Sequence, residues 1–338
     1  MESVAATFLN QHRIPGLSVA IAAHGDLVYQ QGFGFADLDK RESAMASNLF
    51  RIASVSKPIT SVAVFDLIER GKLNLEQFVF GPDGILHSDF GESHRPFVNE
   101  IRLKHLLTHT CGGWPNDATD PMFHNIGMNH KQLIKWTLAN IPLTYQPGQH
   151  YAYSNFGYCV VGRVIEKVTG MTYEIHVRDT ILRSCGISDM QISGNTQRDR
   201  APGEVKYYSP PGEEPYKMNV RRMDSHGGWL ASAPDLVRFL VHVDGFPNPP
   251  DILHPTSILE MTTATTANPQ YAKGWAVNSA PNWWHIGSLP GTTTVMVRTA
   301  SGFCWAALAN SREKGTDTGG ALDQMVWNMV RKVKSWKA

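Results

Sequence analysis

The sequence predicts an α/β (α+β) fold, in which an antiparallel sheet flanked by helices is built from both ends of the chain and a mainly helical lobe is inserted between them. Three observations predict it: β-rich runs occur near both termini, the segment between them is helical and rich in loops, and 338 residues are enough for two lobes. We expect residues 1–75 and 201–338 to form the α/β lobe and residues 76–200 the helical lobe, with an active site between them.

The chain begins with a predicted helix and a hairpin. The stretch MESVAATFLNQHRIPG has the pattern of an amphipathic helix and lacks the basic-then-apolar layout of a signal peptide. The next stretch, GLSVAIAAHGDLVYQQGFGFAD, contains two β-rich runs joined by a turn at residues 24–26. This start predicts a cytoplasmic chain, or an exported one from which a signal has been removed, so the location stays open.

The later elements follow the same plan. The stretches EIRLKHLLTHT, NHKQLIKWTLANI and SNFGYCVVGRVIEKVTG are predicted helices, and the last ends at Gly170. A loop rich in Pro and Gly covers residues 209–217. Strands return in WWHIGSLPG, TTTVMVRTA and FCWAALANS. The closing helix carries one apolar stripe at helical spacing, formed by Leu322, Met325, Val326, Met329, Val330 and Val333.

Composition excludes several classes of function. With 42% hydrophobic residues, 18% charged residues and a formal net charge of +1, the chain offers no electrostatic basis for binding nucleic acid or an anionic membrane. No apolar run approaches the ~20 residues that span a bilayer. The four cysteines form no C-x-x-C pair and are predicted to be isolated buried thiols. We therefore expect no nucleic-acid partner, no transmembrane segment, no cofactor and no metal.

Two S-x-x-K patterns occur in the chain, and their surroundings differ. Ser311 and Lys314 lie in the polar stretch NSREKG, which predicts a surface turn. Ser54 and Lys57 instead open an apolar stretch, where Pro58 is tolerated only in the first turn of a helix. The sequence therefore places Ser54 at a helix N-terminus, with Lys57 one turn further on the same side.

That arrangement has a chemical use. A serine hydroxyl becomes a nucleophile when a neighbouring base accepts its proton, and a lysine can be that base once burial lowers its pKa. The backbone N–H of Ser54 can also face a developing oxyanion. The simpler alternative is a capping serine beside a solvated lysine.

Two further motifs contain chemically useful groups. Tyr153 and Asn155 form a Y-x-N pattern at the start of a predicted helix, where a phenol can relay protons and a carboxamide can hold a carbonyl; a core tyrosine beside a capping asparagine is the alternative. His285 and Gly287 form an H-x-G pattern on a predicted strand. The glycine would let a substrate approach the backbone, and the N–H of Ser288 would be a second oxyanion donor.

A rival H-x-G pattern at residues 226–228 lies in SHGGWLASAPDL, a predicted loop that leads into a helix. The order S-x-x-K, Y-x-N, H-x-G resembles the penicillin-recognising serine hydrolases, which include class C β-lactamases, DD-peptidases, D-aminopeptidases and β-lactamase-like carboxylesterases. IRLKHLLTHTCGG is similar to that family's LLTHTSG stretch, and PGQHYAYSNFGYCVVGRVIEKVTGMTY and GGWLASAPDLVRFL also resemble family segments. The resemblance extends from about Ile14 to Ser311.

The resemblance implies a role for each motif residue. Ser54 would be acylated, and Lys57 and Tyr153 would share the base and acid roles, with the first proton acceptor left open. Asn155 would orient the acyl carbonyl. The N–H groups of Ser54 and Ser288 would form the oxyanion hole, beside His285 and Gly287.

One departure from the family bears on the substrate. The third motif of the family usually has a hydroxyl-bearing residue in the middle, and here that residue is Ile286. His285, with an ordinary pKa of about 6.5, is mostly neutral at pH 7, and Trp283 and Trp284 are expected to form an apolar wall nearby. The resemblance therefore favours a β-lactamase-like carboxylesterase or peptidase that prefers uncharged ester, amide or peptide substrates. A β-lactamase, a DD-peptidase and a D-aminopeptidase remain alternatives.

Other classes fit less well. His105 and His109 are four residues apart, as in zinc hydrolases, but the glutamate that metalloproteases need between them is absent. A G-x-S-x-G nucleophile elbow is absent as well. A catalytically silent relative that binds peptidoglycan fragments or a protein is the non-enzyme alternative. The sequence does not predict the oligomeric state.

Overall fold

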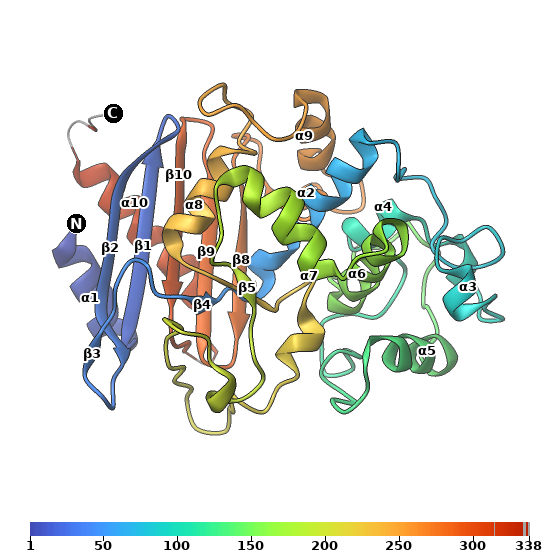
Figure 1. Ribbon diagram of the computed structural model, residues 1–338, viewed down its shortest axis with the longest axis horizontal. Coiled ribbons are helices and arrows are strands. Elements are labelled where there is room, and N and C mark those ends of the chain that lie inside the picture. Colours follow the sequence, from blue (N-terminus) through green and yellow to red (C-terminus); the bar gives the residue numbers. More distant parts are fainter. Residues whose placement is uncertain (314, 334–335, 337–338) are drawn as a thin grey trace.

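The computed structural model describes residues 1–313, 315–333 and 336, and its centre is a seven-stranded antiparallel sheet (Figure 1). The strand order is β3-β2-β1-β10-β9-β8-β7, and β1 pairs with β10 so that Leu17 lies opposite Ala309. Strands from both ends of the chain thus meet in one sheet, which confirms the predicted fold class. The strands are β1 Gly16–Ala23, β2 Asp26–Asp37, β3 Glu42–Ser43, β7 Ala276–Val277, β8 Trp283–Leu289, β9 Thr292–Arg298 and β10 Phe303–Ala309.

Helices cover both faces of this sheet. The terminal helices α1 (Glu2–His12) and α10 (Thr318–Lys332) pack together on one face, and α8 (Ala233–Val241) lies on the other (Figure 1). The apolar stripe predicted for the closing helix is buried against Trp305 of β10, except that Val333 lies just past the end of α10. This burial removes apolar surface from water and fixes the two chain ends to the sheet.

The helix α2 (Ser56–Glu69) lies between the sheet and the helical part of the molecule and is buried nearly all round. Its buried polar side chains are hydrogen-bonded: Thr60 donates to the carbonyl of Ser225 (2.6 Å), and Ser61 to that of Lys273 (2.6 Å). Ser54 precedes α2 in a 3-10 turn, η1 (Ala53–Val55), so the predicted placement at a helix start is confirmed.

The helical part consists mainly of residues from the middle of the chain. The predicted helix at residues 100–110 is shorter than expected, because His109 adopts a left-handed conformation (φ 57°) and only α4 (Leu103–Leu107) is helical. The helix α6 (Asn155–Thr169) is followed by its C-cap Gly170, so it ends where predicted. The other α-helices are α3 His87–Phe90, α5 His130–Asn140, α7 Tyr173–His176 and α9 Pro255–Thr262, with a π-helical segment η3 at Val177–Leu182.

Small elements that the sequence did not predict connect the two parts. The strands β4 (Phe50–Arg51), β6 (Trp229–Ala231) and β5 (Gln191–Ile192) form a second, three-stranded sheet. Short 3-10 turns occur at η2 Val98–Glu100, η4 Arg183–Cys185, η5 Gln197–Asp199 and η6 Val220–Met223. The lobe boundaries after residues 75 and 200 stay a prediction.

The structure also bears on the predicted loop, the second S-x-x-K serine, the cysteines and membrane-spanning segments. Residues 209–217 form the predicted loop. Ser311 is not in an exposed turn as predicted: it is 8% exposed and donates to the carbonyl of Tyr208 (2.8 Å), while Lys314 lies outside the described residues. Within the described residues all four cysteines are buried and unpaired, as expected, and no helix is long and apolar enough to cross a membrane.

Candidate active site

The structure brings Ser54 and Lys57 together at the start of α2. Lys57 Nζ lies 3.1 Å from Ser54 Oγ, and the Lys57 side chain is fully buried while Ser54 is partly exposed. The residue before the serine, Ala53, adopts a left-handed conformation (φ 48°), which is unusual for a residue other than glycine. The backbone at this turn is therefore held in place by its surroundings.

Two carbonyl oxygens orient the Lys57 amine. Nζ donates to Asn155 Oδ1 (2.8 Å) and to the backbone carbonyl of His226 (2.9 Å). These bonds use two N–H groups, so the third position on the nitrogen faces Ser54 Oγ. Burial holds the pKa of Lys57 well below its usual 10.5, and the charge of Asp120 opposes this shift. In the neutral amine the third position is a lone pair, which can accept the Ser54 proton.

Tyr153 also lies close to the lysine. Lys57 Nζ is 4.7 Å from the centroid of the Tyr153 ring. Burial raises the pKa of Tyr153 above its usual 10, and an interaction with Ser54 opposes the rise. Tyr153 is therefore a phenol that carries its proton at neutral pH, and the predicted trio of Ser54, Lys57 and Tyr153 meets at one place.

Asn155, the first residue of α6, has partners that the sequence did not reveal. Its Nδ2 donates to Asn116 Oδ1 (3.0 Å) and to Asp120 Oδ2 (2.9 Å), while its Oδ1 accepts from Lys57. Asn116 and Asp120 lie between α4 and α5 in a segment without regular structure, and they match none of the three motifs. The predicted role of Asn155, orienting a substrate carbonyl, would require one of these bonds to open.

His285 is the last side chain of a hydrogen-bonded relay that begins at the backbone N–H of Ser154. The backbone N–H of Ser154 donates to His109 Nδ1 (3.1 Å), so the proton of neutral His109 is on Nε2 and points to Tyr271 Oη (3.2 Å). Tyr271 in turn lies 3.0 Å from His285 Nε2, and His285 Nδ1 lies 2.7 Å from the carbonyl of Ile286. Because that carbonyl can only accept, His285 Nδ1 carries the proton and Nε2 accepts from Tyr271.

Burial keeps His285 neutral. Burial, assisted by the charge of Lys57, lowers the pKa of His285 to about 3. Burial likewise holds the pKa of His109 well below its usual value. Both ring nitrogens of His285 have protein partners. The ring therefore carries no positive charge, and its one N–H group is already bonded within the protein.

The rest of the third motif packs against the protein. A β-carbon at Gly287 would lie 2.2 Å from the carbonyl oxygen of Ile52, so the close neighbour of this glycine is the backbone just before Ser54. Ser288 is exposed, and its hydroxyl accepts from Arg312 Nη1 (3.1 Å). Ile286 faces the other side of the sheet, where Gly319 of α10 lies against it.

The two tryptophans expected to form an apolar wall point to opposite faces of β8, because successive side chains of a strand alternate. Trp284 packs with the cluster on the α10 face, so its expected place beside the site is wrong. Trp283 lies on the same face as His285, where its ring packs against the guanidinium of Arg298, with the ring centroid 3.8 Å from Cζ.

The rival H-x-G pattern and the zinc-like pair of histidines have other roles in the structure. His226 precedes β6, and its backbone carbonyl binds Lys57, so the rival H-x-G segment does contribute to the site. The sequence could not predict this contact, because every residue has a backbone carbonyl and only the folded chain brings this one to Lys57. For the zinc pattern, His105 Nδ1 accepts from the backbone N–H of Arg102 (3.1 Å), and His109 is part of the Tyr271 relay.

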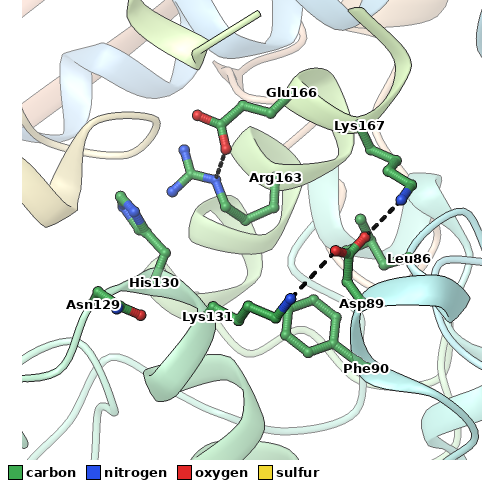
Figure 2. Close-up of a pocket in the computed structure, with 9 residues that line it drawn as sticks. All are labelled: Leu86, Asp89, Phe90, Asn129, His130, Lys131, Arg163, Glu166 and Lys167. Carbon is green, nitrogen blue, oxygen red and sulfur yellow. Dashed lines mark hydrogen bonds and ion pairs between the residues drawn. The ribbon is translucent and has the colours of Figure 1, made fainter. Parts of the chain in front are cut away.

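A separate cavity of about 410 Å³ lies in the helical part of the molecule (Figure 2). Asp89 pairs there with Lys131 (3.7 Å) and Lys167 (2.9 Å), and Arg163 pairs with Glu166 (2.8 Å). Three cations and two carboxylates thus line this cavity, and none of the motif residues does.

Comparison with known families decides the relationship. The model of the family described as Beta-lactamase matches residues 1–325. The chain belongs to the β-lactamase family. Penicillin-binding protein 4* of Bacillus subtilis (strain 168) is 25% identical over 327 residues, covering 88% of this chain and 68% of that protein. Esterase EstB of Burkholderia gladioli is 27% identical over 252 residues, covering 70% of this chain and 62% of that protein.

The chain therefore spans only part of each of these β-lactamase-family relatives. Among solved structures, D-amino acid amidase from Ochrobactrum anthropi SV3, complexed with L-phenylalanine amide, superposes with a TM-score of 0.79 at 20% identity, covering 99% of both chains. At that identity the likeness shows the β-lactamase-like fold alone. The β-lactamase-family relatives matched here thus include one protein named an esterase and one named a penicillin-binding protein.

Proposed function

We propose that this protein is a serine hydrolase that forms an acyl-enzyme at Ser54 and cleaves ester or amide bonds. The observation that carries the proposal is the buried Lys57 amine, which two carbonyls aim at Ser54 Oγ over 3.1 Å. A solvated lysine beside a capping serine would have no such constraint. The motifs in matching order and the family membership support the same assignment.

Lys57 is the first proton acceptor in this proposal. Burial lowers the pKa of Lys57 and raises that of Tyr153, so it favours the uncharged, proton-accepting form of the amine and the protonated form of the phenol. Ser54 Oγ attacks the acyl carbon while its proton moves to Lys57 Nζ. The bond to the leaving group then breaks as Tyr153 gives its proton to that group and regains one from Lys57. Water releases the acyl group by the reverse sequence.

The preferred acyl group carries no carboxylate beside the scissile bond. Support comes from His285, which is neutral and donates only to the carbonyl of Ile286, and from Ile286, which has no hydroxyl and faces α10. Uncharged esters therefore fit better than penicillins, cephalosporins or peptides ending in D-alanine. Since EstB is named an esterase, its similarity to this chain points the same way.

The test compares three substrates: a short-chain nitrophenyl ester, a D-amino-acid amide and a chromogenic cephalosporin. We expect kcat/KM to be highest on the ester, with an initial burst of nitrophenol stoichiometric with enzyme. Absence of turnover on all three, together with absence of a burst, would instead favour the catalytically silent alternative. A cephalosporin that is cleaved faster than the ester would overturn the substrate preference but not the acyl-enzyme.

A further inference from the structure

Asp120 is a buried carboxylate beside the catalytic lysine that none of the three motifs contains. It is 0% exposed and lies in the irregular segment between α4 and α5. Its Oδ1 accepts from the backbone N–H of Met122 (2.8 Å), and its Oδ2 accepts from Asn155 Nδ2 (2.9 Å). Burial raises the pKa of Asp120, whereas the hydrogen bonds that both of its oxygens accept favour the ionised carboxylate.

The partners of Asn155 leave its carboxamide only one orientation. The Nδ2 group faces two oxygens, Asn116 Oδ1 and Asp120 Oδ2, while Oδ1 faces Lys57 Nζ. A flipped amide would place its oxygen against a carboxylate and its N–H groups against an amine. Asp120 thereby determines that Asn155 presents an acceptor to Lys57.

We propose that Asp120 is a positioning residue that acts through Asn155, orienting the amine of Lys57 toward Ser54 and stabilising the positive charge that Lys57 gains when it takes the serine proton. This inference rests on the proposed function, because it assigns Asp120 a part in the same proton transfer. It also gives Asn155 a role within the protein in place of, or in addition to, contact with a substrate carbonyl.

The charged and titratable groups around Lys57 support this assignment. Tyr153 and Tyr158 face it from the region of α6, His109 from the end of α4, His226 from the turn before β6, and His285 from β8. The three histidines are kept neutral by burial, which lowers their pKa values. Among the described residues that act on Lys57, Asp120 is the one carboxylate, and its charge raises the pKa of the lysine.

The main test is Asp120→Asn, with Asp83→Asn as the control, since Asp83 is an exposed carboxylate that is not among the groups that act on Lys57 or Asp120. In Asp120→Asn we expect the plateau of kcat/KM to fall about 10- to 100-fold, the usual cost of losing a hydrogen bond to a charged group. Since the charge of Asp120 raises the pKa of Lys57, loss of that charge should move the acid limb of the pH profile to lower pH. Asp83→Asn should match the wild type in both respects.

A purely structural role would lower activity without moving the acid limb, so an unmoved or raised limb overturns the proposal. If Asp120→Asn does not fold, as judged by circular dichroism and thermal melting, Asp120→Glu replaces it. That variant keeps the charge but displaces the contact with Asn155, so its plateau should fall while its acid limb stays within the range of the wild type; wild-type activity would overturn the proposal. Failure of the wild type to be acylated at Ser54 would sink the proposed function instead, so the two failures are distinguishable.

Discussion

Gly287 of β8 lies directly against the carbonyl of Ile52, two residues before Ser54, and a β-carbon at residue 287 would fall 2.2 Å from that oxygen. The same β-carbon would lie 2.4 Å from Thr294 Oγ1, whose hydroxyl also donates to the Ile52 carbonyl (2.8 Å). The strand that carries the third motif and the turn that carries the nucleophile are thus packed backbone to backbone.

Gly287→Ala should displace the turn that carries Ser54, because the new β-carbon would overlap the carbonyl oxygen of Ile52. We expect a loss of about 1–3 kcal/mol in the free energy of unfolding, as is usual for overpacking, and a larger proportional loss in kcat. The measurements are urea unfolding and steady-state kinetics on a nitrophenyl ester. Gly170→Ala is the control: unlike Gly287 it has a positive φ (69°), but it has open space around it, so the change should cost about 1 kcal/mol and leave activity intact. Equal activity in both variants would contradict the packing argument.

Lys57 and Tyr153 should behave as one proton-transfer unit, because both converge on Ser54. Lys57→Ala and Tyr153→Phe should each lower kcat/KM by ~10² to 10⁴. The double variant should be little worse than the more damaging single one, as in groups that work together. If the two losses multiply, the residues act independently and the proposed proton path is wrong.

The pH dependence of the wild type should reveal the altered lysine. A base must be deprotonated to act, and burial lowers the pKa of Lys57, so its active form exists at a lower pH than for an ordinary lysine. Activity should therefore be lost only as the pH falls through a value well below 10.5. The check is kcat/KM as a function of pH, with the exposed Lys72→Arg as a control that should leave the profile unchanged. A rate that keeps rising up to the ordinary lysine pKa would show that the base has an unshifted pKa, which contradicts a buried Lys57 amine with a lowered pKa in that role.

Ile286→Thr should leave the ratio of cephalosporin turnover to ester turnover close to that of the wild type. The Ile286 side chain faces Gly319 of α10, on the side of the sheet opposite His285, so a threonine hydroxyl there would not reach a substrate beside Ser54. The measurement is kcat/KM on a chromogenic cephalosporin and on a nitrophenyl ester, with Ile286→Val as a control that shortens the side chain without adding a hydroxyl. A rise in the ratio of roughly tenfold or more in Ile286→Thr alone, the size expected for a new hydrogen bond to a charged group, would show that residue 286 does face the substrate.

The elements that the sequence predicted well are those with strong local patterns. The hairpin at residues 16–37, the last three strands of the sheet and the stripe of α10 all follow from periodicity and turn residues. The S-x-x-K pair was also predictable, because Pro58 and the apolar stretch after it fix a helix start. The short strands β4, β5 and β6 were missed, since two or three residues carry no periodic pattern.

The groups that surround Lys57 were missed for a different reason. Asp120 lies in an irregular segment, and His226 contributes a backbone carbonyl, which every residue has. Tyr271 reaches His285 from a loop fourteen positions away in the sequence, and only tertiary packing brings the two together. The exposure of Ser311 was misjudged because its contact with Tyr208 joins segments more than a hundred residues apart. Such contacts are set by the fold and not by local sequence.

The central claim is that Ser54 is the acylated nucleophile, and covalent labelling tests it most directly. The purified protein is treated with a fluorophosphonate, which phosphonylates a serine Oγ with loss of fluoride, and the modified peptide is located by mass spectrometry. We expect a single adduct on the peptide that contains Ser54, with neither the adduct nor ester turnover in Ser54→Ala, whose melting temperature should remain close to that of the wild type. An adduct on another serine, or near-normal turnover by Ser54→Ala, would contradict the proposed function.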